Sequence, residues 1–387
     1  MTSDTETPGP APVPSPRQRS VRRDRVLVAV AAAVVTTAVV LTAVVVIGHH
    51  GKAKPPSRAA PTTTAASGTL PPPSTAPGQT AAGRPFAATS FWNAPLPAST
   101  PLNPLSNVYV TDLERQIADY FGGTAGINTT KFSAPIYVVG HDQPTIPIHY
   151  WNCQNKSGTQ PQALFEAEVS AVPMPPNATV PTDHDAEMVV WQPSTAQEWE
   201  IWRARRDATG GWQACWGGHL SGASYDTGIF PHPYGATATG LPLLGGEITM
   251  AELRSGHIDH ALGIAIPDAR KAVFSWPANR TDGQIADPNA IPEGQRFRLD
   301  PTLDIAALHL NPVAQMIAEA AQRYGIVVWD RAGAVVFRAE NPLVSPAASP
   351  ANPYHALFNQ LQPAKVLADF PFNRLEALPF NYGQTGS

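Results

Sequence analysis

Hydrophobic and polar positions divide the chain into four stretches. Residues 1–25 are polar and proline-rich, with too few large apolar side chains to build a core. An uncharged, mainly apolar run follows at 26–48, about as long as a helix needs to cross a bilayer. Residues 49–88 are rich in proline, threonine and alanine, whereas 89–387 alternate short apolar runs with polar turns. The pattern predicts a disordered tail, a transmembrane helix, a disordered linker and one folded domain.

Charges beside the apolar run predict its orientation. The preceding segment carries five arginines, which are Arg17, Arg19, Arg22, Arg23 and Arg25. Because basic residues favour the cytoplasmic side of a bilayer, we expect 1–25 to be cytoplasmic and 89–387 to be extracellular. The run 26–48 would then be an uncleaved signal-anchor helix in the cell membrane. A cleaved signal peptide is the alternative, although its apolar region is usually about 7–15 residues long.

Capping signals predict three helices within 89–387. Thr111 and Glu114 have the spacing of a capping box, as do Thr249 and Glu252. An asparagine and a proline open the third helix, over 311–325. Three glycines suit the left-handed position that ends these helices: Gly122, Gly256 and Gly325. The first helix has an apolar stripe that we expect to be buried, formed by Leu113, Ile117 and Phe121.

Alternating apolar and polar residues predict an antiparallel meander in the middle of the domain. Its strands cover 187–192, 198–205 and 212–216, with turns at "PSTAQ" and "RDATGG" between them. Alternate residues of a strand share a face. One face of the second strand should therefore carry Glu198, Glu200 and Trp202, and the other face should carry Trp199 and Ile201.

Two further strand predictions complete the fold class. The segment "IDHALGIAIP" reads as a strand that begins at about Ile258, and 326–341 reads as a hairpin that turns at 331–333. On the first strand His257 and Asp259 share a face, while His260 points toward the core. Many short strands with a few helices predict a mainly β protein with peripheral helices, of the α+β class. We expect an antiparallel β-sandwich or a jelly-roll-like domain.

Charge and cysteine content narrow the partners and the compartment. The chain has 26 Lys+Arg and 30 Asp+Glu, and residues 84–387 hold 18 and 27 of them, a net charge of −9. Such an acidic domain is not expected to bind nucleic acid, because that affinity depends on neutralising phosphate charge. Cys153 and Cys215 are predicted to form a disulfide, since both lie in the exported part. Two buried free thiols are the alternative.

Candidate catalytic residues come from scattered acids and histidines rather than from a known motif. The chain has no G-x-S-x-G, H-E-x-x-H, Walker loop or paired C-x-x-C. A carboxylate beside an imidazole, as in His257 and Asp259, orients a general base; a solvated start of the strand is the alternative. The candidate set for acid and base roles is Asp185, Glu200, His219, Tyr225, His257 and Asp259.

A metal site is not expected. His257 and His260 would point to opposite faces of a strand, which separates the two imidazoles. Three acids share a face if their segment is extended: Asp183, Asp185 and Glu187. Such carboxylates bind Ca²⁺ or cleave glycosidic bonds as a pair, with a solvated loop as the alternative interpretation. We therefore expect no cofactor, with Ca²⁺ as the weaker alternative.

Tryptophans are concentrated in the predicted meander. Five of them lie within 26 positions: Trp191, Trp199, Trp202, Trp212 and Trp216. Indole rings pack well against the C–H faces of sugar rings, and carboxylates beside them accept hydrogen bonds from hydroxyl groups. The segment therefore predicts a sugar-binding floor that contains Trp199, Trp202 and Trp216. Packing in the core is the alternative role for these rings.

Several segments resemble a family of secreted or membrane-anchored actinobacterial proteins. They are "MVVWQPSTAQEWEIWRA", "GWQACWGG", "YGATATGLPLLGGEITMAELRSGHIDHALGIAIP" and "AAQRYGIVVWDRAGAVVFRAENP". The resemblance covers roughly 89–372. That family has no assigned activity, so the resemblance implies a continuous domain and an envelope location but no catalytic residues.

These features predict a membrane-tethered extracellular protein that binds or acts on a neutral polysaccharide of the cell envelope or the environment. As an enzyme it would be a glycoside hydrolase or a lyase. A lyase must also neutralise a uronate carboxylate, and the acidity of the domain therefore favours neutral glycans. The alternative is a non-catalytic, wall-anchored binding or structural module.

Overall fold

The computed structural model describes residues 85–344 and 352–384. All of them belong to the unit Pro72–Ser387. The predicted tail 1–25 and transmembrane helix 26–48 lie outside the described residues, as does the linker up to residue 84. In the part of the chain that is described, no helix is long and apolar enough to cross a membrane. The membrane topology therefore stays a prediction.

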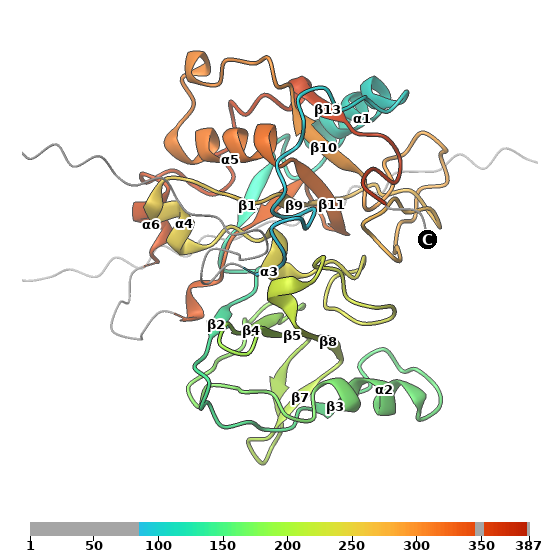
Figure 1. Cartoon of the computed structure of the whole chain (residues 1–387), viewed down its shortest axis with the longest axis vertical. Helices are drawn as coiled ribbons and strands as arrows, with labels where there is room; N and C mark the ends of the chain where they lie inside the picture. Colours follow the sequence, from blue (N-terminus) through green and yellow to red (C-terminus); the bar gives the residue numbers. More distant parts are fainter. Residues whose placement is uncertain (1–84, 345–351, 385–387) are drawn as a thin grey trace, which may run out of the picture. The chain divides into compact units, whose positions relative to one another are not determined.

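Six strands form the largest sheet. Their bounds are Gly126–Asn128 (β1), Leu262–Ile266 (β9), Arg296–Leu299 (β10), Ile326–Arg331 (β11), Val336–Arg338 (β12) and Leu375–Ala377 (β13). They lie in the order β1-β12-β9-β11-β10-β13 (Figure 1). Helix α5 (Pro312–Arg323) packs against β10, and helix α1 (Ser106–Asp119) packs against β13. Every residue of β9 is buried, as its continuous apolar run requires.

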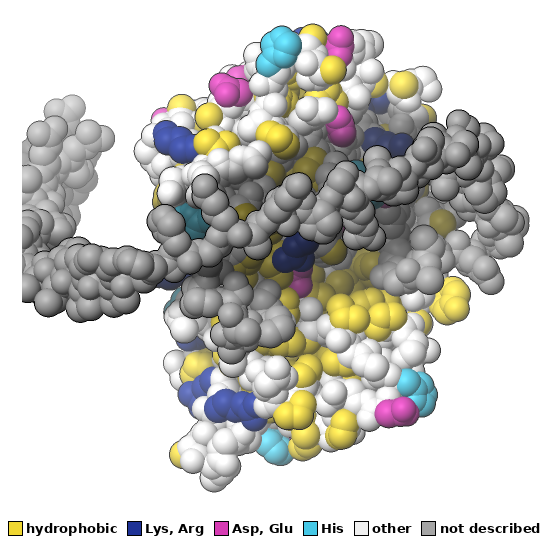
Figure 2. Space-filling view, turned by 90° about the vertical axis from the view of Figure 1, so that its left-hand side faces the viewer, with side chains coloured by type: hydrophobic (Ala, Val, Ile, Leu, Met, Phe, Trp, Pro, Cys, Tyr) yellow, Lys and Arg dark blue, Asp and Glu magenta, His cyan; other side chains and the backbone are white. Residues whose placement is uncertain are grey.

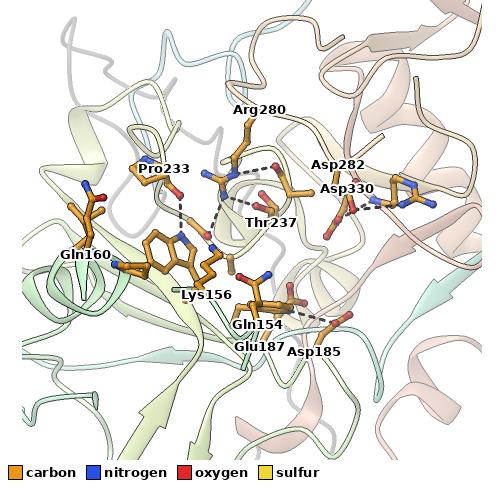
Figure 3. Close-up of a pocket in the computed structure, with 18 residues that line it drawn as sticks. Gln154, Lys156, Gln160, Asp185, Glu187, Pro233, Thr237, Arg280, Asp282 and Asp330 are labelled. Atoms are coloured by element: carbon orange, nitrogen blue, oxygen red, sulfur yellow. Dashed lines mark hydrogen bonds and ion pairs between the residues drawn. The ribbon is translucent and has the colours of Figure 1, made fainter. Parts of the chain in front are cut away.

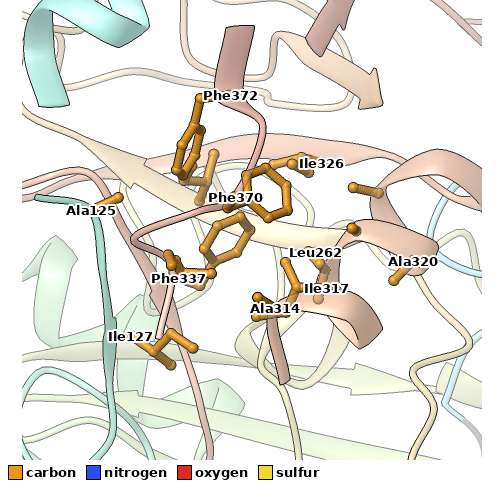
Figure 4. Close-up of a cluster of buried hydrophobic side chains, with 14 of the residues drawn as sticks. Ala125, Ile127, Leu262, Ala314, Ile317, Ala320, Ile326, Phe337, Phe370 and Phe372 are labelled. Atoms are coloured by element: carbon orange, nitrogen blue, oxygen red, sulfur yellow. The ribbon is translucent and has the colours of Figure 1, made fainter. Parts of the chain in front are cut away.

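A hydrophobic cluster joins α5 to the centre of this sheet (Figure 4). Ile317 of α5 faces Leu262 of β9 and Phe337 of β12, and the rings of Phe370 and Phe372 complete the cluster. The buried positions of α5 recur three and four residues apart, which is the spacing of one helix face. Burial of each large apolar side chain contributes about 1.5–3 kcal/mol, so this cluster fixes α5 on the sheet.

Two smaller sheets form the part of the domain drawn in green in Figure 1. The four-stranded sheet consists of β2 (Ile136–Val138), β4 (Met188–Gln192), β5 (Gln197–Trp202) and β8 (Trp216–Ser221), paired in that order. The three-stranded sheet consists of β3 (His149–Tyr150), β7 (Trp212–Ala214) and β6 (Arg205–Arg206), also in pairing order. Helix α2 (Gln160–Glu168) contacts β3 and β8.

The segment between β8 and β9 connects the green part to the large sheet. It contains α3 (Leu243–Gly246), which contacts β9, and α4 (Met250–Ser255), which contacts α6 (Tyr354–Leu357). Glycines permit the close approach of α3, because a Cβ on Gly246 would lie 2.6 Å from the Trp329 ring. The Thr239 hydroxyl also donates to the Trp329 carbonyl at 2.7 Å. These contacts hold the segment against β11.

The structure confirms the α+β class with a β-rich fold, but its sheets are mixed. The pairs β1–β12, β9–β11, β2–β4 and β3–β7 are parallel. An antiparallel sandwich or jelly roll is therefore not confirmed. Parallel partners lie far apart along the chain, whereas alternation within one strand reports only which residues share a face.

The predicted hairpin over 326–341 is wrong in its pairing. Both strands form, as β11 and β12, but β9 lies between them and pairs parallel with β11 and antiparallel with β12. The strand expected from about Ile258 begins later, at Leu262. Each strand of the predicted hairpin therefore pairs with the apolar strand β9 and not with the other hairpin strand.

The meander is confirmed in its first two strands only. β4 and β5 pair antiparallel, and the two faces of β5 divide as expected, with Glu198 and Glu200 on one and Trp199 and Ile201 on the other. The third predicted strand is wrong in its bounds and pairing, because the strand that pairs with β5 is β8, which shares only Trp216 with 212–216. Residues 212–214 instead form β7 in the three-stranded sheet.

The observed helix caps show which helix ends the sequence predicts correctly. The capping box of Thr249 and Glu252 is present in α4, and Gly256 ends that helix with φ 82°. Asn311 caps α5 as predicted. Helix α1 begins at Ser106, so Thr111 lies inside it and does not cap it. Phe121 is 65% exposed, contrary to the predicted buried stripe, since it lies beyond the end of α1.

The predicted disulfide between Cys153 and Cys215 is confirmed, with a Cα–Cα distance of 5.6 Å. It joins the segment after β3 to the junction of β7 and β8. The two cysteines are 62 residues apart in sequence. A cross-link that closes a loop of this length stabilises a fold by about 4 kcal/mol in the chain-entropy model.

Candidate functional site

A cleft of about 610 Å³ lies between the four-stranded sheet and the end of β11 (Figure 3). Trp202 of β5 and Trp216 of β8 line it. Asp330 of β11 and Asp282 lie close together on one side of it. The loop 233–238 forms the rim. Because the walls come from segments far apart in sequence, the cleft exists only in the folded domain.

Charges on the lining side chains nearly balance. Three are basic and four are acidic: Lys156, Arg280 and Arg331 against Asp185, Glu187, Asp282 and Asp330. Figure 2 shows a comparable mixture of basic, acidic and hydrophobic side chains on one face of the molecule. A field of one sign would select an oppositely charged ligand. The balance instead favours an uncharged polar ligand, whose hydroxyl groups both donate and accept hydrogen bonds.

Arg338 of β12 connects the two walls of the cleft. Its guanidinium donates to Glu187 Oε2 at 2.5 Å and to Asp330 Oδ2 at 2.8 Å, and its side chain is only 3% exposed. Burial raises the pKa of Asp330 to about 6, and the charge of Arg338 opposes that rise. Burial also raises the pKa of Glu187 well above its usual range, again opposed by Arg338. Loss of one partner from such a buried pair typically costs about 3–5 kcal/mol.

Arg280 holds the rim loop. Its guanidinium donates to four backbone carbonyls, those of Tyr234, Gly235, Thr237 and Ala238. Burial lowers the pKa of Arg280 to about 10, which leaves the group charged at neutral pH. Hydrogen bonds from a charged donor are stronger than those between neutral groups. The rim is therefore ordered before any ligand arrives.

Two tryptophans place apolar surface inside this polar cleft. The Trp202 indole N–H points at Asp185 Oδ1 at 3.5 Å, and the Trp216 indole N–H donates to the Pro233 carbonyl at 2.9 Å. The Trp216 ring is stacked with that of Tyr234, with centroids 6.1 Å apart. Both tryptophans are half-buried. These hydrogen bonds hold both indole rings in the lining of the cleft.

Glu198 and Glu200 lie beneath the cleft and are fully buried. Glu200 Oε1 accepts a hydrogen bond from the Leu244 N–H at 3.1 Å. The N–H of Ala236, a residue of the rim, also interacts with Glu200. Burial raises the pKa of Glu200 to about 7; burial and the charge of Glu200 raise the pKa of Glu198 well above its usual range. Glu200 thus helps to hold the rim loop of the cleft in place through the backbone of Ala236.

The structure brings some of the sequence-predicted site residues together and separates others. Asp185, Trp202 and Trp216 line the cleft, and Glu200 lies beneath it. Trp199 is 5% exposed and stacks on His219 with ring centroids 4.6 Å apart, outside the lining of the cleft. Burial lowers the pKa of His219.

The remaining predicted residues lie on other surfaces. Tyr225 is 77% exposed on a 3₁₀ turn. His257 and Asp259 contact one another as expected, with Nε2 3.5 Å from Oδ2. His260 is 13% exposed, and its Nε2 lies 3.1 Å from Glu252 Oε1 of α4. His257 thus contacts Asp259 and His260 contacts Glu252, close to the end of α4, and none of these side chains lines the cleft.

The three acids that the sequence suggested as Ca²⁺ ligands, Asp183, Asp185 and Glu187, do not point toward one common position. Asp183 Oδ1 accepts from the backbone N–H groups of Asp185 and Ala186, and its Oδ2 accepts from the Phe132 N–H at 3.0 Å. Asp183 therefore caps a turn. Glu187 pairs with Arg338 instead.

Sequence reasoning missed Arg280, Asp282, Asp330 and Arg338. The segment that contains Asp330 has the pattern of a strand followed by a turn, which predicts the tip of a hairpin rather than the wall of a cleft. The one available signal is an acid within an apolar strand, because a buried carboxylate needs a partner. Its partner Arg338 is on β12, on the far side of β9.

Comparison of the chain with protein-family models, with curated proteins and with solved structures finds no match. The resemblance to secreted or membrane-anchored actinobacterial proteins therefore stays a prediction. Function has to be argued from the geometry of the cleft.

Proposed function

We propose that the cleft binds a neutral polysaccharide of the cell envelope or the environment. The observation that carries the proposal is the pairing of two fixed, half-buried tryptophans, Trp202 and Trp216, with carboxylates in one cleft. Indole faces pack against C–H faces of sugars, and carboxylates accept hydrogen bonds from hydroxyl groups. The near balance of charge supports an uncharged glycan.

The proposed setting is outside a cell, on a membrane anchor. The disulfide between Cys153 and Cys215 supports an exported domain, because such bonds persist in oxidising compartments. The apolar run 26–48 and the proline-rich segment after it are the basis for the anchor and the linker. The protein would then hold a wall glycan or an environmental glycan near the membrane.

Titration of the full-length chain with soluble neutral polysaccharides tests the proposal. Trp202→Ala and Trp216→Ala should each weaken binding about tenfold or more, which corresponds to about 1.4 kcal/mol. Trp151→Ala is the matched control, because Trp151 is also half-buried but lies outside the cleft lining. Isothermal titration calorimetry measures the glycan affinity of the native chain and of the three variants.

Absence of binding across a panel of neutral glycans would refute the proposal, as would equal losses for Trp151→Ala and the two cleft variants. Reducing ends should be assayed in the same samples. Their release would make the protein a hydrolase, and their absence with intact binding would make it a binding module.

A further inference from the structure

Three carboxylates converge at the wall of the cleft formed by β11. One carboxylate oxygen from each of Asp282, Glu293 and Asp330 lies within 4.8 Å of the others. We call these residues the carboxylate trio. Asp282 is 53% exposed and Asp330 is 15% exposed at their side chains, whereas Glu293 is fully buried. The trio therefore extends from the interior to the cleft.

Glu293 has one oxygen that the protein does not satisfy. Its Oε2 accepts hydrogen bonds from the Thr281 hydroxyl at 2.5 Å and from the Asp282 N–H at 3.0 Å. Its Oε1 is buried and has no hydrogen-bond partner among residues 85–344 and 352–384. A buried polar atom left without a partner destabilises the fold, because it has lost its hydrogen bonds to water and gained none in the protein. The arrangement is explained if a ligand that is not a protein group occupies the space between the three carboxylates.

The backbone around Glu293 is fixed, so the trio does not depend on a mobile loop. The Glu293 carbonyl accepts from the Ser275 N–H at 2.8 Å, and the Gly294 N–H donates to the Val328 carbonyl at 2.6 Å. Gly294 has φ 82°, and a Cβ there would lie 1.7 Å from the Ser275 carbonyl oxygen. The turn that carries Glu293 therefore requires glycine and holds the carboxylate in place.

We infer that the carboxylate trio binds a hard divalent cation, with Ca²⁺ as the best match. Oxygens lie about 2.3–2.6 Å from Ca²⁺, so two ligands of one ion are at most about 5 Å apart, which fits the spacing of the trio. Mg²⁺ requires shorter distances and a more regular octahedron. Arg331 Nη1 lies 3.7 Å from Asp282 and offsets part of the negative charge. The ion would satisfy Glu293 Oε1, and water would complete its coordination from the cleft.

Calorimetric titration of Ca²⁺ into the full-length chain, freed of ions with EDTA and then desalted, tests the inference. One Ca²⁺ per chain should bind. Glu293→Gln and Asp282→Asn should each weaken that binding at least tenfold. Asp142→Asn is the control, because its carboxylate is fully exposed and remote from the trio, and it should leave the affinity unchanged. Mg²⁺ should compete only weakly.

No saturable binding of Ca²⁺ to the native chain would overturn the inference. An affinity of Asp282→Asn for Ca²⁺ equal to that of the native chain would overturn it as well. Asp282 is half-exposed, so this variant keeps the test valid if Glu293→Gln does not fold. Ca²⁺ is titrated without a glycan, so a failure of the proposed glycan binding leaves this result unaffected.

Discussion

Stability of the folded domain should fall as pH rises, because it buries carboxylic acids that remain protonated. Glu200 is the clearest case: burial raises its pKa to about 7 from the usual 4.5. The folded state then keeps a proton that the unfolded chain releases above about pH 4.5. The stabilising effect of that proton is fully present below pH 4.5 and is lost as pH rises toward 7. Since one pKa unit corresponds to about 1.4 kcal/mol, this shift corresponds to a loss of stability on the order of 3 kcal/mol for the titration of the neighbouring pair Glu198 and Glu200.

Glu247 adds to the same trend, because burial raises its pKa to about 8. Substitution of Glu200 by glutamine removes this titrating group, together with the charge that raises the pKa of Glu198. The amide retains an oxygen that can accept the Leu244 N–H but does not titrate over this range. Between pH 4.5 and pH 8, the free energy of unfolding should therefore fall less in the variant than in the native protein, by about 3 kcal/mol.

Urea unfolding at steps of pH, followed by tryptophan fluorescence, measures these free energies. Glu114→Gln, at an exposed position on α1, is the control and should reproduce the native profile. Identical slopes for the native protein and Glu200→Gln would refute the reasoning. A native stability that rises from pH 5 to pH 8 would refute it as well.

Two further predictions concern α4 and the membrane topology. His260→Ala removes the contact with Glu252 and should destabilise by about 1–3 kcal/mol, whereas His257→Ala, at an exposed position, should change stability by less than about 1 kcal/mol. Urea unfolding measures both, and equal effects would contradict the difference in burial. Protease added to intact, wall-stripped cells should remove 89–387 and leave residues up to 48 protected. Protection of the whole chain, detected with an antibody to 89–387, would contradict the predicted orientation.

Features governed by neighbouring residues were predictable from the sequence. The capping box at Thr249 and the left-handed Gly256 depend on residues within one helical turn. The antiparallel pairing of β4 with β5 follows from alternation on both sides of a short turn. The disulfide followed from an even number of cysteines and the predicted export of the domain. Each of these predictions needs only a short segment of sequence or a count of residues.

Features that depend on distant partners were not predictable. Glu187 and Arg338 are 151 positions apart, and they meet although Glu187 precedes β4 of the four-stranded sheet and Arg338 belongs to β12 of the six-stranded sheet. No local pattern specifies which strand takes the central position, since β9, β11 and β12 all begin with buried apolar residues. The cleft residues Asp330 and Arg331 of β11, and Arg338 of β12 behind them, were therefore missed, while Asp185, Trp202 and Trp216 were found from their residue types in the predicted meander and the loop before it.

Hydroxyl-radical footprinting with and without a neutral oligosaccharide tests the central claim, that the cleft is a glycan site. Oxidation of each tryptophan in the full-length chain is quantified by mass spectrometry. Bound glycan should protect Trp202 and Trp216 while leaving Trp151 as reactive as in the free protein. Unchanged oxidation of Trp202 and Trp216 under saturating glycan, or protection confined to Trp151, would contradict the account.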